Sequence, residues 1–219
     1  MKNVMTRRFV MNTVAVALLT GSLSACIPLV VGGAVVGGTL VASDRRTSGA
    51  QLEDEGIELR STSRIRSNVG NRVHVNVNSY NRQVLLTGEV PTVQDKLLVE
   101  QIISRVENVS SVVNELAVMD SSSLTQRSSD VLVTGHVKAM LVDAKDLFAN
   151  SFRVVTERGT TYLMGRVTQR EEDRGTAVAR GTPGVQKVVR IFEIISEEEL
   201  ARQLPASAKP PAARPATAN

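Results

Sequence analysis

Cys26 is the one nucleophilic side chain whose surroundings in the sequence suggest chemistry, and it is the only cysteine of the chain. It follows Leu23-Ser24-Ala25, and an apolar run over residues 9–19 lies upstream, behind three basic residues. A basic start, a short apolar segment and small residues before a cleavage point are typical of a secretory signal peptide. The apolar run is shorter than the roughly 20 residues that a membrane-spanning helix needs.

The sequence Leu-Ser-Ala-Cys at residues 23–26 resembles the lipobox of bacterial lipoproteins. The resemblance implies that the thiol of Cys26 takes a diacylglycerol and that Cys26 becomes the first mature residue, with two or three acyl chains. One acyl chain anchors a protein marginally, whereas two anchor it stably. Ile27 follows in place of an aspartate, which by the same resemblance permits export to the outer membrane. The alternative is an ordinary signal peptide followed by a chance cysteine.

Sets of residues that would support catalysis or metal binding are not found at recognisable spacing. The sequence has no cysteine cluster, no His-x-x-x-His, no Gly-x-Ser-x-Gly elbow and no Walker loop. His74 is expected to face solvent from an alternating strand, and His136 falls in a helix discussed below. Asp143, Asp146 and the carboxylates at 171–173 are expected at helix ends or on solvated faces. We therefore predict no enzyme, no cofactor and no metal site.

Charge gives little support for nucleic acid as a partner. The formal charge of +4 falls to +1 once residues 1–25, with their three cations, are removed. Only 3% of the residues are aromatic, too few for a base-stacking platform. A single cysteine also excludes an intramolecular disulfide, so packing alone must stabilise the fold.

The two ends of the mature chain differ in composition from its middle. Residues 26–48 are expected to form a lipidated, glycine-rich tether, although an apolar stretch at 27–43 leaves a membrane helix open as an alternative. An acidic run, Glu197 to Glu199, opens the C-terminal segment 197–219, and its Pro/Ala-rich part, 205–219, is expected to be disordered.

The middle of the chain repeats itself with a period near 77 residues. Residues 84–90, VLLTGEV, parallel residues 161–167, TYLMGRV, and residues 108–113 parallel 184–189 with a slip of one residue. A period of this length suits tandem small domains rather than a solenoid. We expect domains at 49–119 and 125–196.

Each repeat reads as helix, strand, strand, helix, strand. Two strands joined by a short turn, then a helix and a third strand, imply a right-handed crossover and a parallel pair. The resulting α+β unit has a three-stranded mixed sheet with both helices on one face. The expected first helices are residues 51–69 and 130–142; the expected turns are 79–81 and 157–159; capping sequences begin at Thr92 and Thr168; and the third strands are 111–118 and 185–195.

The stretch from Val154 to Glu171, VVTERGTTYLMGRVTQRE, with Gly184 to Val188 beyond it, resembles the BON domain family. The resemblance covers roughly residues 50–196 and is stronger in the second repeat. Two such units behind a lipobox resemble the dual-BON outer-membrane lipoproteins. This resemblance implies lipid-anchored domains in the periplasm, binding of anionic phospholipid by the second unit, and a role in outer-membrane integrity.

The helix expected at 130–142 carries more apolar surface than one sheet face requires. Its core stripe is expected to comprise Val133, Val137, Met140 and Leu141. Charge points the same way: residues 125–195 hold eleven Lys/Arg and eight Asp/Glu, whereas residues 49–119 hold seven and nine. A positive excess favours an anionic surface.

From the family resemblance, the matching helix is the one that meets lipid. Leu132 takes a place where relatives often have tryptophan, an interfacial anchor. Leu132, His136, Lys138 and Ala139 are therefore the predicted phospholipid-binding residues. The extra apolar residues pack against the first unit in the alternative interpretation.

We therefore expect a non-catalytic, lipid-anchored envelope protein whose first partner is the membrane, with other envelope proteins as further candidate partners. The competing hypothesis is a structural scaffold that binds envelope proteins without any dependence on lipid.

Overall fold

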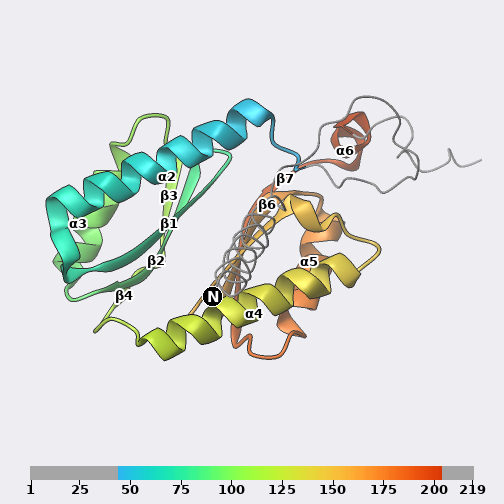
Figure 1. Cartoon of the computed structure of the whole chain (residues 1–219). Helices are drawn as coiled ribbons and strands as arrows, with labels where there is room; N and C mark the ends of the chain where they lie inside the picture. Colours follow the sequence, from blue (N-terminus) through green and yellow to red (C-terminus); the bar gives the residue numbers. More distant parts are fainter. Residues whose placement is uncertain (1–43, 204–219) are drawn as a thin grey trace, which may run out of the picture. The chain divides into compact units, whose positions relative to one another are not determined.

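The computed structural model describes residues 44–203, and within them the order helix, strand, strand, helix, strand occurs twice (Figure 1). The predicted signal peptide, Cys26, the segment 27–43 and the tail 205–219 lie outside the described residues. The first unit comprises α2 (Ser48–Val69), β1 (His74–Tyr80), β2 (Gln83–Val90), α3 (Val93–Ser104), β3 (Ser111–Asn114) and β4 (Ala117–Val118). The second comprises α4 (Leu124–Asp143), β5 (Phe152–Glu157), β6 (Thr160–Val167), α5 (Gln169–Arg180) and β7 (Lys187–Ile194), and α6 (Glu197–Gln203) follows it.

Both sheets are mixed, as the sequence predicted. β2 pairs antiparallel with β1 and parallel with β3, and β6 does the same with β5 and β7. The third strand of the first unit is interrupted, because pairing with β2 stops after Asn114 and resumes at Ala117 as β4. The prediction of one uninterrupted strand over 111–118 is therefore wrong at residues 115 and 116, where the strand is broken.

Side chains in front of the helices fix where these helices begin. The Thr47 and Ser123 hydroxyls accept from the backbone N–H groups of Ala50 and Gln126, so α2 and α4 begin before residues 51 and 130, where the sequence placed them. Thr168 and Glu171 form the predicted capping box at α5. Each cap satisfies N–H groups that the first helical turn leaves without partners.

Each unit has one apolar core, which lies between its sheet and its own pair of helices. Figure 1 shows α2 and α3 together on one face of the first sheet, with α4 and α5 covering a face of the second. The first core joins Ile57, Ile65 and Val69 of α2 and Val99 and Ile103 of α3 to Val84, Leu86 and Val90 of β2. The second core joins Val133, Val137 and Leu141 of α4 and Ala179 of α5 to Phe152, Val154, Leu163 and Val167 of the sheet.

The hairpin turns are tight, and the first differs from its prediction. Asn81 and Arg82 form it with φ of 49° and 67°, and Arg158 and Gly159 form the second with φ of 51° and 72°. Positive φ at both central residues belongs to the turn that suits the twist of paired strands. Ser79 and Tyr80 lie in β1 instead of in the expected turn 79–81, because both pair with β2, and the buried Ser79 hydroxyl donates to Asp54.

A third apolar cluster joins the opposite faces of the two sheets. Leu85 lies between Val84 and Leu86 in sequence, so its side chain points away from the first core. It packs with Tyr80 of the first unit and with Tyr162, Met164 and Ile191 of the second. Both sheets are therefore covered on two faces.

Within residues 44–203, no helix is both long enough and apolar enough to cross a membrane.

Candidate functional site

The outer side of α4 carries an exposed apolar stripe. Val133, Val137 and Leu141 are buried. Four apolar side chains on the other side are more than 60% exposed: Leu124 (79%), Val131 (70%), Leu132 (65%) and Val142 (67%). Spacings of seven, eight and eighteen residues from Leu124 bring them to one face at about 100° per residue. Exposed apolar side chains gathered on one face indicate an interaction surface.

All four residues predicted to meet lipid lie at this surface. Leu132, His136, Lys138 and Ala139 are exposed, with His136 and Lys138 on either flank of the apolar stripe. The alternative, in which Leu132 packs against the first unit, does not fit its 65% exposure. Met140 was expected in the core but is 44% exposed. The buried face of α4 is centred on Val137 and Leu141, and Met140 lies at the edge of that face.

A hollow of about 640 Å³ adjoins the C-terminal half of α4, on the flank that carries Lys138. Lys138 and Val142 line it together with Asn78 and Arg153. Arg153 pairs with Glu58 at 2.8 Å and donates to the Asn78 Oδ1 at 3.0 Å. Lys138 thus lines a recess in which the Arg153 cation is already neutralised by Glu58.

The segment before α2 is held by buried arginine pairs. Arg45 binds Glu171 with both guanidinium nitrogens at 2.7 Å, and the two side chains are 5% and 0% exposed. Burial raises the pKa of Glu171, but Arg45 and the Thr168 N–H outweigh burial and leave the pKa below its usual value. Arg46 pairs with Asp54 of the first unit at 2.7 Å. Glu171 lies at a helix end, as one of the two expectations has it, but it is buried rather than solvated, because Arg45 covers it.

His74 also departs from its prediction, because it faces a buried carboxylate. Its Nδ1 lies 2.8 Å from Oε2 of Glu89, which is directly opposite in the β1–β2 register and 0% exposed. Glu157 of β5 approaches the same place, and Asn76 donates to it at 2.8 Å. The alternation of apolar and polar residues along β1 correctly put His74 on the side away from the first core. It gave no sign that the second sheet covers that side.

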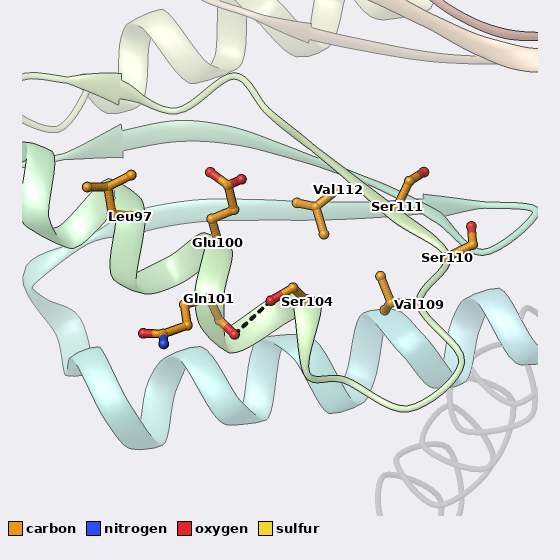
Figure 2. A pocket seen from close by; sticks show the side chains of 8 residues that line it. All are labelled: Leu97, Glu100, Gln101, Ser104, Val109, Ser110, Ser111 and Val112. Carbon is orange, nitrogen blue, oxygen red and sulfur yellow. Dashed lines mark hydrogen bonds between the residues drawn. The ribbon is translucent and has the colours of Figure 1, made fainter.

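A second recess, of about 460 Å³, lies in the first unit between α3 and β3 (Figure 2). The Ser104 hydroxyl donates to the backbone oxygen of Gln101 at 3.0 Å, and Glu100 accepts from Asn114 at 2.8 Å. The Glu100, Ser104 and Ser110 side chains are thus engaged with neighbouring protein groups. This recess provides no pair of acid and base.

Comparison with known proteins shows which family has this architecture. The family model described as BON domain matches residues 53–120 and 129–195. The Haemophilus influenzae protein named Outer membrane lipoprotein DolP is 35% identical over 185 residues, which cover 82% of this chain and 95% of that protein. A 21 kDa hemolysin of Actinobacillus pleuropneumoniae is 28% identical over 154 residues, or 69% of this chain and 79% of the hemolysin.

Among solved structures, the C-terminal domain of CdsD, a structural protein of the type III secretion system of Chlamydia trachomatis, covers 63% of this chain and 96% of its own. The TM-score is 0.28 at 14% identity, a likeness that supports no conclusion about fold or function.

Proposed function

The chain belongs to the BON domain family as a DolP-like protein with two BON domains, and on this premise we propose that it is an outer-membrane lipoprotein that binds anionic phospholipid through α4 of its second BON domain. In this proposal acyl chains on Cys26 anchor the protein, and the BON domains extend into the periplasm. The role is non-catalytic and supports the integrity of the outer membrane.

The observation that carries the proposal is the exposed stripe on α4 with Lys138 beside it. Val131 and Leu132 are 70% and 65% exposed, although a soluble helix normally keeps such side chains inward. A helix with an apolar outer stripe and flanking cations can lie in the interface between lipid headgroups and acyl chains. Each cation near an anionic membrane contributes about 1 kcal/mol.

Vesicle co-sedimentation tests the proposal on residues 26–219 carrying Cys26→Ser, which removes the acyl anchor. We expect sedimentation with vesicles of phosphatidylcholine and phosphatidylglycerol and little with phosphatidylcholine alone. Leu132→Glu should weaken partitioning by about tenfold or more, because burying a leucine contributes about 1.5–3 kcal/mol. Lys138→Glu should weaken it most at low salt, since charges at the surface are screened beyond about 8 Å at physiological ionic strength.

The matched controls are Leu59→Glu on α2, where the leucine is 73% exposed, and Lys187→Glu on β7. Both should bind as the parent does. Circular dichroism must first show that every variant is folded. Unchanged binding by folded Leu132→Glu and Lys138→Glu would remove α4 as the lipid site.

A scaffold that binds envelope proteins is the second candidate, and one observation favours it. Leu52 and Leu59 of α2 lie seven residues apart and are 71% and 73% exposed, so the first BON domain also presents an apolar face. In a scaffold, Leu59→Glu would impair recovery of partners from crosslinked envelopes, while vesicle binding by the parent would be absent.

A further inference from the structure

A histidine and two glutamates meet where the two BON domains face each other. His74 comes from β1, Glu89 from β2 and Glu157 from β5, and one potential ligand atom of each lies within 4.8 Å of the other two. Glu89 is 0% and Glu157 8% exposed, and the His74 side chain is 20% exposed. The three side chains therefore share a small space with limited access to water.

The Glu89 carboxylate is bound on one oxygen only. Its Oε2 lies 2.8 Å from His74 Nδ1 and accepts from the Ser122 N–H and hydroxyl, each at 3.2 Å. Its Oε1 is buried and has no hydrogen-bond partner, and the Arg158 guanidinium stays 3.6 Å away. A buried carboxylate oxygen without a hydrogen bond is costly even with a cation 3.6 Å away, and such an atom in a native fold calls for a closer partner.

The charge around Glu157 also calls for a cation. Two buried carboxylates, those of Glu89 and Glu157, lie beside one imidazole, and the Asn76 amide donates a hydrogen bond to Glu157 at 2.8 Å. Asp130 adds negative charge from α4, although its oxygens accept from the backbone N–H groups of Arg158 and Gly159. The Arg158 guanidinium is the nearby cation, and its side chain is 39% exposed, so much of its charge is solvated by water.

We propose that His74, Glu89 and Glu157 bind one divalent cation of the zinc type and so link the two BON domains. One imidazole and two carboxylates are a ligand set that Zn²⁺ accepts, with a water in the fourth position. Calcium and magnesium prefer oxygen ligands, so the histidine favours zinc over both. Ligands of a tetrahedral zinc ion lie about 3.4 Å apart. The three candidate ligand atoms lie within 4.8 Å of one another, so small side-chain rotations suffice to place them around one ion. Asn76 orients Glu157 from outside the ligand set, as outer hydrogen bonds do at metal sites.

The test uses residues 26–219 with Cys26→Ser, which also removes the one thiol that would compete for zinc. The protein is stripped with a chelator, dialysed, and titrated with zinc chloride by calorimetry. We expect one high-affinity site per chain and a rise in melting temperature with zinc, because a ligand bound only by the folded state stabilises that state. Magnesium and calcium should give neither result. X-ray absorption at the zinc edge should show nitrogen and oxygen ligands.

His74→Ala and Glu157→Gln should each weaken zinc binding at least tenfold and abolish the rise in melting temperature. His74→Ala retains His136, so binding at a surface histidine would persist in that variant. Glu107→Gln, which changes an exposed carboxylate far along the sequence from the cluster, should bind zinc as the parent does. Circular dichroism in the presence of chelator must show that each variant is folded. If His74→Ala does not fold, the test rests on Glu157→Gln, which preserves the shape of the side chain. Stoichiometric binding that survives in folded Glu157→Gln, or a parent that zinc neither binds nor stabilises, would overturn the proposal.

Discussion

Asp54 and Asp130 perform the same structural task in the two BON domains. Each lies buried on the first helix of its domain, and its carboxylate accepts two backbone N–H groups from the turn of the following hairpin. The distances are 2.8 Å and 2.8 Å from Asn81 and Arg82 to Asp54, and 2.8 Å and 3.0 Å from Arg158 and Gly159 to Asp130. A single carboxylate thus fastens the helix to the hairpin in each repeat.

Replacing this carboxylate in the second domain should cost stability. Asp130→Ala leaves the Arg158 and Gly159 N–H groups without their partner, and a buried donor without a partner costs about 1–3 kcal/mol. The free energy of unfolding in a urea titration should fall by about 2 kcal/mol. Asp143→Ala, at the exposed end of the same helix, should change it by less than about 0.5 kcal/mol. Equal losses in the two variants would contradict the assigned task.

Two glycines of the second domain should respond in opposite directions to the same substitution. A Cβ at Gly165 would lie 2.2 Å from the carbonyl oxygen of Ser151, so Gly165→Ala should destabilise the protein and the larger Gly165→Val more strongly. A Cβ at Gly135 would have nothing within 4 Å, so Gly135→Ala should stabilise α4 by about 0.5–1 kcal/mol. Thermal melts of the variants measure both effects. A Gly165→Ala protein as stable as the parent would show that the backbone at Ser151 can move aside without cost.

The buried pair between Arg45 and Glu171 should matter far more than an exposed pair nearby. Arg45→Ala leaves the Glu171 carboxylate buried without its cation, a loss of about 3–5 kcal/mol. Arg170 and Glu197 lie 3.6 Å apart and are 53% and 57% exposed, so Arg170→Ala should cost less than about 1 kcal/mol. Denaturant titrations at neutral pH compare the two.

The same pair fixes a pH dependence. Because the folded-state pKa of Glu171 is lowered, its stabilising contribution is present above about pH 4.5 and is lost as the pH falls through the folded-state value. The difference between the parent and Arg45→Ala should therefore shrink in acid. A difference that grows below pH 4.5 would contradict this sign.

Glu157 should show the opposite dependence when metal is kept out by a chelator. Its folded-state pKa is raised, so the folded state binds more protons than the unfolded state above about pH 4.5, and stability falls as pH rises through the folded-state value. Glu157→Gln imitates the protonated group and should make the protein at least as stable as the parent at neutral pH. The advantage should fade toward pH 4.5, as a series of thermal melts would reveal. A variant that loses stability most at neutral pH would argue against the raised pKa.

Acylation of Cys26 is tested by Cys26→Ala in the full-length protein. Without the thiol there is no acceptor for diacylglycerol, so labelling with a radioactive fatty acid should disappear and the uncleaved precursor should accumulate. The parent should fractionate with the outer membrane. Normal mass and fractionation of the variant would refute the lipobox interpretation.

Local patterns in the sequence were enough to predict the repeated α+β unit. Alternation around β1, the turn at Arg158 and Gly159, and the capping box of Thr168 and Glu171 depend on neighbours within a few residues, so sequence spacing reveals them. The resemblance to the BON family rested on the same local stretches. The predicted lipid-facing residues remain a prediction, although their exposure on α4 agrees with it.

Contacts between distant segments were decided by the tertiary structure alone. Leu85 and Met164 pack together because the second faces of both sheets meet, and consecutive apolar residues in β2 and β6 were the one local sign that both faces are covered. Nothing near His74 in the sequence indicates that Glu157 comes within reach, and nothing near Arg45 indicates Glu171. The physical reason is that hydrophobic patterning determines which side of an element is buried, whereas the partner on that side depends on how complete domains pack.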